Sequence, residues 1–168
     1  MSVAEHKEKS KKSAGCFVVT VSDTRDETTD QSGQLIKELL AEKGQRLAGY
    51  RIVKDEPVQI EALLQEALDK KDVDVVIVNG GTGISPRDGT YEVVSRLLEK
   101  RLDGFGEIFR LLSYQDIGSA AIMSRAVAGS AKGKVLISLP GSKGAVDLAM
   151  RRLVLPELGH MVSQLQGR

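Results

Sequence analysis

The sequence predicts an α/β fold whose mostly parallel sheet is covered by helices on both faces. Three observations indicate this. Apolar, β-branched runs alternate three times with segments of helical periodicity. The run "VDVVIVN" (73–79) is apolar almost throughout, as in strands buried on both faces. A chain of 168 residues is long enough for one core. We therefore expect a single domain over residues 15–168, after a flexible polar tail over residues 1–14.

The first half of the chain contains three predicted β-to-α units. A strand at 16–21 ("CFVVTV") leads through a polar loop to a helix that ends near Gly44. A weaker strand at 47–53 precedes a helix that begins at Pro57. The strand at 73–79 feeds a glycine-rich loop and a third helix. The apolar residues of the three helices recur at helical spacing: Leu35, Ile36, Leu39 and Leu40; Ile60, Leu63, Leu64, Ala67 and Leu68; Val93, Val94, Leu97 and Leu98.

The second half is less regular because glycines interrupt its helical pattern. Residues 102–129 predict two helices joined by a turn near 114–118. The run "KVLISLP" (134–140) predicts a fourth buried strand. A terminal helix over 141–165 follows, which Pro156 is expected to kink or break.

Composition excludes several classes of function. The 24 basic and 23 acidic side chains nearly cancel and tryptophan is absent, so we expect no nucleic-acid partner. No run resembles a signal peptide or a membrane span, which predicts a cytoplasmic protein without membrane contact. Cys16 is the single cysteine and is expected to be a buried hydrophobe. Two histidines leave few routes to a catalytic triad or a histidine-rich metal site, which favours chemistry with carboxylates and a hard cation.

The loop from Val78 to Thr90, "VNGGTGISPRDGT", is the strongest candidate site. Glycine lets backbone N–H groups approach a phosphate, and this loop lies between a strand and a helix N-terminus. Its spacing matches neither the P-loop nor the dinucleotide-binding fingerprint. Glycine content alone would fit a tight structural turn equally well. Hydroxyl groups in the loop could add hydrogen-bond donors: Thr82, Ser85 and Thr90.

Asp88 changes the interpretation of this loop. A carboxylate inside an anion-binding loop repels phosphate unless a cation lies between them, and a carboxylate-bound Mg²⁺ would resolve that conflict. The alternative is that Asp88 caps the following helix.

Polar residues also follow the other predicted strands. Ser22 and Asp23 follow the first strand, Asp55 follows the second, and "PGSKGA" follows the fourth. In a parallel sheet these strand ends face one edge, where ligands bind. Singly each has a cap or turn explanation, whereas together they favour a nucleotide or phosphate pocket.

As a set, "NGGTGISPRD", "GFGEIFRLLSYQDIG", "SRAVAG" and "LPGSKGA", with "TVSDTR" and "KDE" before them, resemble the MoaB/MogA family of molybdenum cofactor biosynthesis proteins, and MoaB more than MogA. The resemblance extends from about Gly15 to Leu165. It implies a three-layer α/β/α molybdopterin-binding fold in homotrimers or homohexamers. It also implies Mg²⁺-dependent adenylylation of molybdopterin by ATP, which yields adenylyl-molybdopterin and pyrophosphate, and a molybdenum-insertion protein as partner.

The resemblance also implies roles for individual residues. Asp55 and Asp88 match the family's two critical aspartates, expected to be catalytic and to bind the metal. Asn79 stands where the family usually has threonine. The residues that match substrate- or nucleotide-binding positions are Ser22, Asp23, Gly80, Gly81, Thr82, Gly83, Glu107, Ser113, Pro140, Gly141 and Ser142.

Two other kinds of function stay open at this point: a non-catalytic molybdopterin-binding or carrier protein, and an assembly protein that binds neither ligand. Arg110 and Arg125 could contact an anionic ligand or form ion pairs between subunits. Lys143 could contact phosphate or lie at a solvated helix end, and His160 is expected at a surface or interface.

Overall fold

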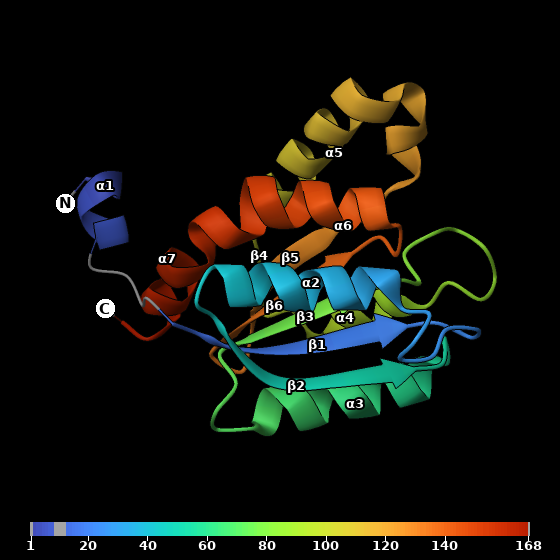
Figure 1. Cartoon of the computed structure of the whole chain (residues 1–168), viewed down its shortest axis with the longest axis horizontal. Helices are drawn as coiled ribbons and strands as arrows, with labels where there is room; N and C mark the ends of the chain where they lie inside the picture. Colours follow the sequence, from blue (N-terminus) through green and yellow to red (C-terminus); the bar gives the residue numbers. More distant parts are fainter. Residues whose placement is uncertain (1, 9–12, 168) are drawn as a thin grey trace.

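A computed structural model describes residues 2–8 and 13–167. It contains a six-stranded sheet in the order β2-β1-β3-β6-β5-β4 between two layers of helices (Figure 1). Neighbouring strands among β2, β1, β3 and β6 are parallel, whereas β5 and β4 are antiparallel to their neighbours. The strands are β1 (Gly15–Val21), β2 (Arg46–Val53), β3 (Val75–Asn79), β4 (Lys100–Arg101), β5 (Val127–Ala131) and β6 (Lys134–Leu139). The predicted three-layer fold with a mostly parallel sheet is confirmed.

The helices divide between the two faces of the sheet. Helices α2, α5, α6 and α7 lie on one face, and α3 and α4 lie on the other (Figure 1). Their bounds are α1 (Val3–Glu8), α2 (Gln31–Glu42), α3 (Pro57–Asp69), α4 (Thr90–Leu97), α5 (Asp103–Ile117), α6 (Lys143–Ala149) and α7 (Leu155–Leu165). A 3₁₀ segment, η1 (Gly118–Met123), follows α5, and a π-helical segment, η2 (Met150–Val154), joins α6 to α7. All three predicted β-to-α units are confirmed.

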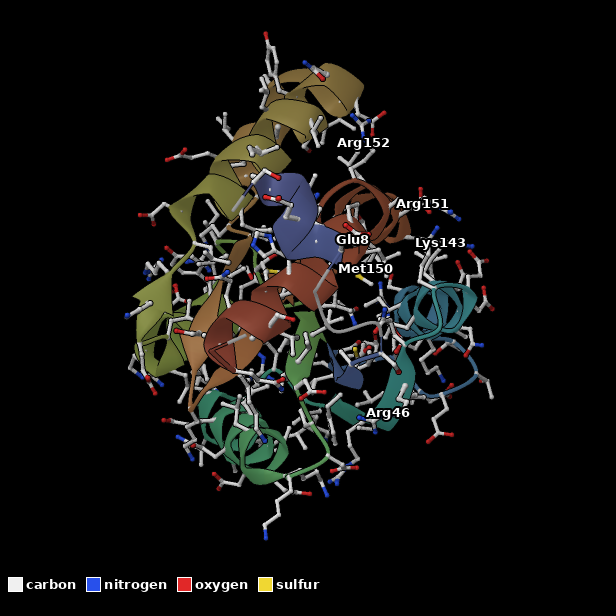
Figure 2. All side chains as sticks on the ribbon, turned by 90° about the vertical axis from the view of Figure 1, so that its left-hand side faces the viewer. Glu8, Arg46, Lys143, Met150, Arg151 and Arg152 are labelled. Atoms are coloured by element: carbon white, nitrogen blue, oxygen red, sulfur yellow. The ribbon has the colours of Figure 1, made fainter. Side chains whose placement is uncertain are left out.

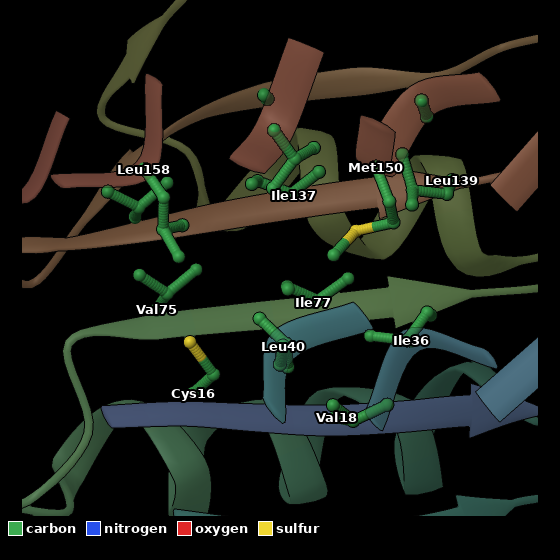
Figure 3. Close-up of a cluster of buried hydrophobic side chains, with 14 of the residues drawn as sticks. Cys16, Val18, Ile36, Leu40, Val75, Ile77, Ile137, Leu139, Met150 and Leu158 are labelled. Atoms are coloured by element: carbon green, nitrogen blue, oxygen red, sulfur yellow. The ribbon is translucent and has the colours of Figure 1, made fainter. Parts of the chain in front are cut away.

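The larger core lies under α2, α6 and α7. Figure 3 shows Ile36 and Leu40 of α2 beside Ile77 of β3, with Met150 of η2 across the same layer. Fully burying an aliphatic side chain of this size contributes about 1.5–3 kcal/mol. Cys16 is completely buried here, and burial raises the pKa of its thiol to about 12. The thiol therefore stays protonated, as the prediction of a buried hydrophobe requires.

The second core lies on the opposite face, under α3 and α4. Ile60 and Leu64 of α3 and Val93 of α4 are buried against Val19 and Val76 of the sheet. The period-two alternation of β1 and β3 sends neighbouring valines to opposite faces. Both faces of these strands are therefore apolar, which is why their sequences read as continuous hydrophobic runs.

The second helix predicted within residues 102–129 is wrong. Helix α5 ends before Gly118, whose φ of +73° is left-handed, and one 3₁₀ segment follows. The next residues form strand β5, which turns through Lys132 and Gly133 into β6. Strand β5 reads "VAGSA", and such small residues give a weak strand signal. Strand β4, two residues long, was also not predicted.

Helix α1 lies beside α7 in the fold (Figure 1). The kink or break predicted at Pro156 takes a milder form: the helix is not broken, but the π-helical segment η2 leads directly into α7, whose second residue is Pro156. The segment predicted as a polar tail includes helix α1, whose Lys7 forms an ion pair with Glu157 of α7. Part of that segment lies outside the described residues, and its flexibility stays a prediction.

Among the described residues, none of the helices combines the length and apolar character that crossing a membrane requires.

Candidate functional site

The loops after β1, β2, β3 and β6 meet at one edge of the sheet, because these four strands run in the same direction. Their ends are also in register: Thr20 pairs with Asn79, and Asn79 pairs with Leu139. Contacts between the loops follow from this. The backbone N–H of Asp55 donates to Asp23 Oδ1 at 3.1 Å, so the loops after β1 and β2 are joined directly.

Gly80 and Gly81 let the glycine-rich loop pack closely against its neighbours. Their φ angles are +97° and +68°, which side chains other than glycine rarely adopt. A Cβ atom at Gly80 would overlap the carbonyl oxygen of Val21, and one at Gly81 would lie 2.8 Å from Asp55 Oδ2. Gly141 packs against Gly80 from the loop after β6. At these positions the backbone of the loop packs closely against neighbouring groups. Gly81 in particular lies against the Asp55 carboxyl group.

Asp55 is a buried carboxyl group with one backbone donor. It is 7% exposed, and its Oδ1 accepts the Gly89 N–H at 3.0 Å. Burial raises the pKa of Asp55, and the nearby charges of Asp88 and Asp23 raise it further. The site thus holds a surplus of negative charge that a cation would relieve.

Asp88 does not cap helix α4. The N-cap residue is Gly89, and no side chain caps this helix. Asp88 instead accepts the Ser85 N–H at 2.9 Å, which closes a tight turn within the loop. Its carboxyl group also lies against Gly83, where a Cβ atom would be 2.6 Å from Asp88 Oδ2. The cap alternative is wrong for this residue.

The side chains at this edge could hold a metal only with the help of a ligand. In the described part of the chain, no group of three or more histidine, cysteine, aspartate or glutamate side chains is placed to bind a metal ion. Asp55 and Asp88 supply two carboxylates, and Mg²⁺ is commonly held by one or two carboxylates together with substrate phosphates and water. The buried hydroxyl oxygen of Thr90, beside Gly81, has no hydrogen-bond partner. The donor set fits Mg²⁺ as a bridge to phosphate.

Arg87 was missed by the sequence analysis. Its Nη2 and Nε donate to the Asp23 carboxylate at 2.9 and 3.1 Å, and its Nη1 donates to Glu56 Oε1 at 2.8 Å. It thereby ties the glycine-rich loop to the loops after β1 and β2. Its partners are 64 and 31 residues away in sequence, so only the topology could have paired them.

Arg25 was also missed. Its Nη1 donates to the Gly141 carbonyl oxygen at 3.1 Å, and it lies 3.8 Å from the buried carboxylate of Asp30. Ser22 Oγ accepts the Arg25 N–H at 3.0 Å. Ser22, just after β1, therefore helps to position Arg25, and Arg25 binds the loop after β6.

Arg125 contacts the glycine-rich loop from within its own chain. Its Nε donates to the Thr82 carbonyl oxygen at 2.9 Å, and its other nitrogens bond to the Gly83 carbonyl oxygen and to Glu92. Its guanidinium also lies over the Tyr91 ring, 4.7 Å from the centroid. Arg125 thus binds the carbonyl oxygens of Thr82 and Gly83 from within its own chain.

The remaining predicted site residues fall into two groups. Ser142 caps α6 by accepting the Ala145 N–H at 3.2 Å, and the exposed Lys143 follows it on the outside of that helix (Figure 2). Glu107 and Ser113 lie on α5, which stands out from the body of the sheet (Figure 1). Glu107 is exposed and Ser113 is buried. Within one chain, these two are not part of the carboxylate cluster.

Two further predictions concern Asn79 and His160. The Asn79 amide nitrogen donates to Val19 O at 3.2 Å and to Thr20 Oγ1 at 2.9 Å, while its amide oxygen is buried without a partner. Asn79 therefore bonds across β1 and β3. His160 lies on α7, half-buried, with Nδ1 3.1 Å from Glu157.

Comparisons with known proteins agree on one family. Residues 17–160 match the family model described as "Probable molybdopterin binding domain". The molybdenum cofactor biosynthesis protein B of Bacillus cereus is 54% identical over 166 residues, which cover 98% of each chain. A crystal structure of a molybdenum cofactor biosynthesis protein B is 53% identical with a TM-score of 0.91, covering 94% of this chain and 98% of that one.

A more distant structure extends the likeness. The tungsten cofactor synthesizing protein MoaB of Pyrococcus furiosus is 37% identical with a TM-score of 0.83 and covers 93% of this chain and 99% of its own. The family-model match at residues 17–160 spans the glycine-rich loop, Asp55, Asp88 and the loop after β6. This chain belongs to the MoaB/MogA family of molybdenum cofactor biosynthesis proteins.

Proposed function

We propose that this protein acts in molybdenum cofactor biosynthesis by transferring the adenylyl group of ATP to molybdopterin, with Mg²⁺ bound. One observation carries the proposal: the carboxyl groups of Asp55 and Asp88 lie against a glycine-rich loop of the kind that binds phosphate. Family membership supports molybdopterin as the second substrate.

In the proposed reaction, an oxygen of the terminal phosphate of molybdopterin attacks the α-phosphorus of ATP. A new P–O–P bond forms, the bond between the α-phosphorus and its bridging oxygen breaks, and pyrophosphate leaves with that oxygen. The attacking phosphate is already ionised at neutral pH, so no general base is required. Such reactions depend on positioning and on neutralising charge.

The residues of this chain would then have distinct tasks. Asp55 and Asp88 would hold Mg²⁺, which when bound offsets the charge of the triphosphate. Gly80 and Gly81, with positive φ angles, shape the loop whose backbone N–H groups would bind phosphate. Asp23 holds the Asp55 backbone, and Arg87 holds Asp23, so both act as positioning residues.

We also propose that the protein works as a homotrimer or a homohexamer, and that a molybdenum-insertion protein takes over its product. Self-association is supported by an apolar surface on α5 and η1 that is exposed in the single chain. Its members are Ile108, Leu111, Tyr114, Ile117, Ile122 and Met123, each at least 48% exposed. Light scattering on the purified protein should give three or six times the 18.2 kDa mass of one chain. A monomer would contradict this part of the proposal.

A non-catalytic molybdopterin carrier is the second candidate. Family membership supports it as well, because the matched family model is described by molybdopterin binding and not by a reaction. A carrier would bind molybdopterin without releasing pyrophosphate.

A reconstituted assay with molybdopterin, ATP and Mg²⁺ separates the two candidates. We expect pyrophosphate and adenylyl-molybdopterin in equal amounts, and neither when any one component is omitted. Tight binding of molybdopterin without pyrophosphate would establish the carrier and overturn the transferase proposal.

A further inference from the structure

A polar hollow lies beside Arg125, outside the carboxylate cluster. Its volume is about 310 Å³, and it is bounded by β4, the first turns of α5 and the segment that leads into β5. Its lining includes three arginines, Arg101, Arg110 and Arg125, together with Tyr91 and Ser124. No predicted site residue of the adenylyl-transfer centre lines it.

The hollow carries a surplus of positive charge. Asp103 is the acidic residue in the lining, against three guanidinium groups. Arg125 is paired with Glu92. Among the ion pairs of the described residues, none involves Arg101 or Arg110. Two cationic groups of the lining are therefore outside any ion pair, and the one carboxylate beside them is that of Asp103.

The guanidinium groups are held in place before any ligand arrives. Arg110 Nη1 donates to the Ala126 carbonyl oxygen at 3.2 Å. A Cβ atom at position 106 would lie 2.6 Å from Arg110 Nη2, so Gly106 makes room for the guanidinium. Preorganised groups lose less conformational freedom on binding, which favours affinity.

Tyr91 forms the opposite wall and orders the other two arginines. Its ring centroid is 4.7 Å from the guanidinium carbon of Arg125 and 5.9 Å from that of Arg101. The Arg101 side chain beside the Tyr91 hydroxyl lowers the pKa of Tyr91. The buried Ser124 hydroxyl oxygen in the same lining has no hydrogen-bond partner.

We propose that this hollow binds the phosphate group of a phosphorylated small molecule through Arg101 and Arg110, without Mg²⁺. Planar guanidinium groups suit phosphate because each can donate two parallel hydrogen bonds to its oxygens. A volume of about 310 Å³ exceeds that of a phosphate ion and is at the lower end of small-molecule sites. The inference goes beyond adenylyl transfer and holds whether or not the protein releases pyrophosphate.

Titration of the protein with pyrophosphate in excess EDTA tests this inference. EDTA removes the Mg²⁺ that phosphate binding beside Asp55 and Asp88 would need. The chain has three tyrosines and no tryptophan, so ligand binding beside Tyr91 is expected to change the tyrosine fluorescence. We expect saturable binding by the unchanged protein, weakened at least about tenfold in Arg101→Gln and in Arg110→Gln. Arg151→Gln is the matched control, since Arg151 pairs with Asp147 on α6 and η2.

Thermal melting shows whether each variant is folded; if Arg110→Gln is not, the exposed Arg101→Gln decides alone. The Asp88→Asn variant should keep the binding of pyrophosphate in EDTA that depends on Arg101. Absence of saturable binding, or equal binding by the Arg101→Gln and Arg151→Gln variants, would overturn the inference. Binding that changes in Asp88→Asn but not in Arg101→Gln would place the anion at the glycine-rich loop and would also overturn it.

Discussion

The two sides of the glycine-rich loop carry opposite charges. On one side, the Asp55 and Asp88 carboxyl groups lie against Gly81 and Gly83. On the other, Arg125 bonds to the carbonyl oxygens of Thr82 and Gly83 and forms one wall of an arginine-lined hollow. One strand-to-helix loop thus offers two environments for phosphate. In the two proposals, the carboxylate side would require a cation before an anion could bind, whereas the arginine side would not.

This difference arises from where the loop's hydrogen-bonding groups point. Carbonyl oxygens accept from Arg125, so that side attracts cationic side chains. The Gly89 and Ser85 N–H groups donate to Asp55 and Asp88, so the other side gathers carboxylates. The carbonyl oxygens of the loop therefore bind a cationic side chain, and its N–H groups bind carboxylates, without any ligand.

The largest effect is expected from neutralising the carboxylate side. Asp55→Asn and Asp88→Asn should each lower Mg²⁺-dependent adenylyl transfer by roughly 10²- to 10³-fold, because the charge that holds the cation is lost. The asparagine amide oxygen can still accept the Gly89 or Ser85 N–H. Initial rates of pyrophosphate release measure the effect.

The control for these variants is Asp69→Asn, which removes an exposed carboxylate paired with Lys132 at the far end of α3. It should keep the full rate. Full activity in both site variants would remove Asp55 and Asp88 from the mechanism.

A large loss of stability is expected from Gly80→Ala. The φ of +97° and the overlap with the Val21 carbonyl oxygen should lower the free energy of unfolding by about 3 kcal/mol. Gly144→Ala is the opposite control, because Gly144 lies in α6 with open space around it. It should raise stability by about 0.5–1 kcal/mol. Urea unfolding measures both, and equal effects would mean that the loop backbone is not strained as described.

Arg125→Gln should have a smaller effect on stability and a direct effect on the loop. Loss of charged hydrogen bonds to Thr82 and Glu92 should cost about 2 kcal/mol in urea unfolding. It should also raise the KM for ATP, because the loop loses its support from the arginine side. Arg96→Gln, which removes an exposed pair with Glu61, should cost less than about 1 kcal/mol. Equal losses of stability in Arg125→Gln and Arg96→Gln would show that Arg125 contributes no more than an exposed ion pair does.

The smallest effect concerns the pH dependence of stability. Because the pKa of Asp55 is raised in the folded state, folding favours its protonated form. The stability from this proton is present below the unfolded pKa of about 3.9 and is lost as the pH rises through the folded pKa. Asp55→Asn should lack this loss, so its stability relative to the unchanged protein should rise with pH above about 4. Urea unfolding of both proteins at several pH values above about 4 measures this difference in stability. If the stability of Asp55→Asn relative to the unchanged protein fell with pH, the pKa of Asp55 would not be raised by folding.

Much of the carboxylate side could be predicted from the sequence. The β-branched runs of β1, β3 and β6 predict parallel strands, and parallel strands bring Asp23, Asp55 and Asp88 to one edge. The family resemblance supplied ATP and molybdopterin, which the residues alone did not. The turn that Asp88 makes with Ser85 was not predicted, because an aspartate just before a helix equally suggests a cap.

The arginine side could not be predicted in the same way. Arg101, Arg110 and Arg125 come from β4, α5 and the segment before β5, where glycines and small residues hide the secondary structure. Their convergence depends on the antiparallel pairing of β4 with β5. Arg87 was missed for a related reason, since its partners are distant in sequence.

Calorimetric titration of ATP, with Mg²⁺ and with EDTA, tests the charge difference between the two sides of the loop most directly. The unchanged protein should bind ATP at the glycine-rich loop only with Mg²⁺, in a step that Arg101→Gln does not alter. The double variant Asp55→Asn, Asp88→Asn should bind ATP about equally with and without Mg²⁺, because the repulsion that the cation offsets has been removed. Mg²⁺-independent binding of ATP to the unchanged protein at this loop, or a double variant that still requires Mg²⁺, would contradict the account.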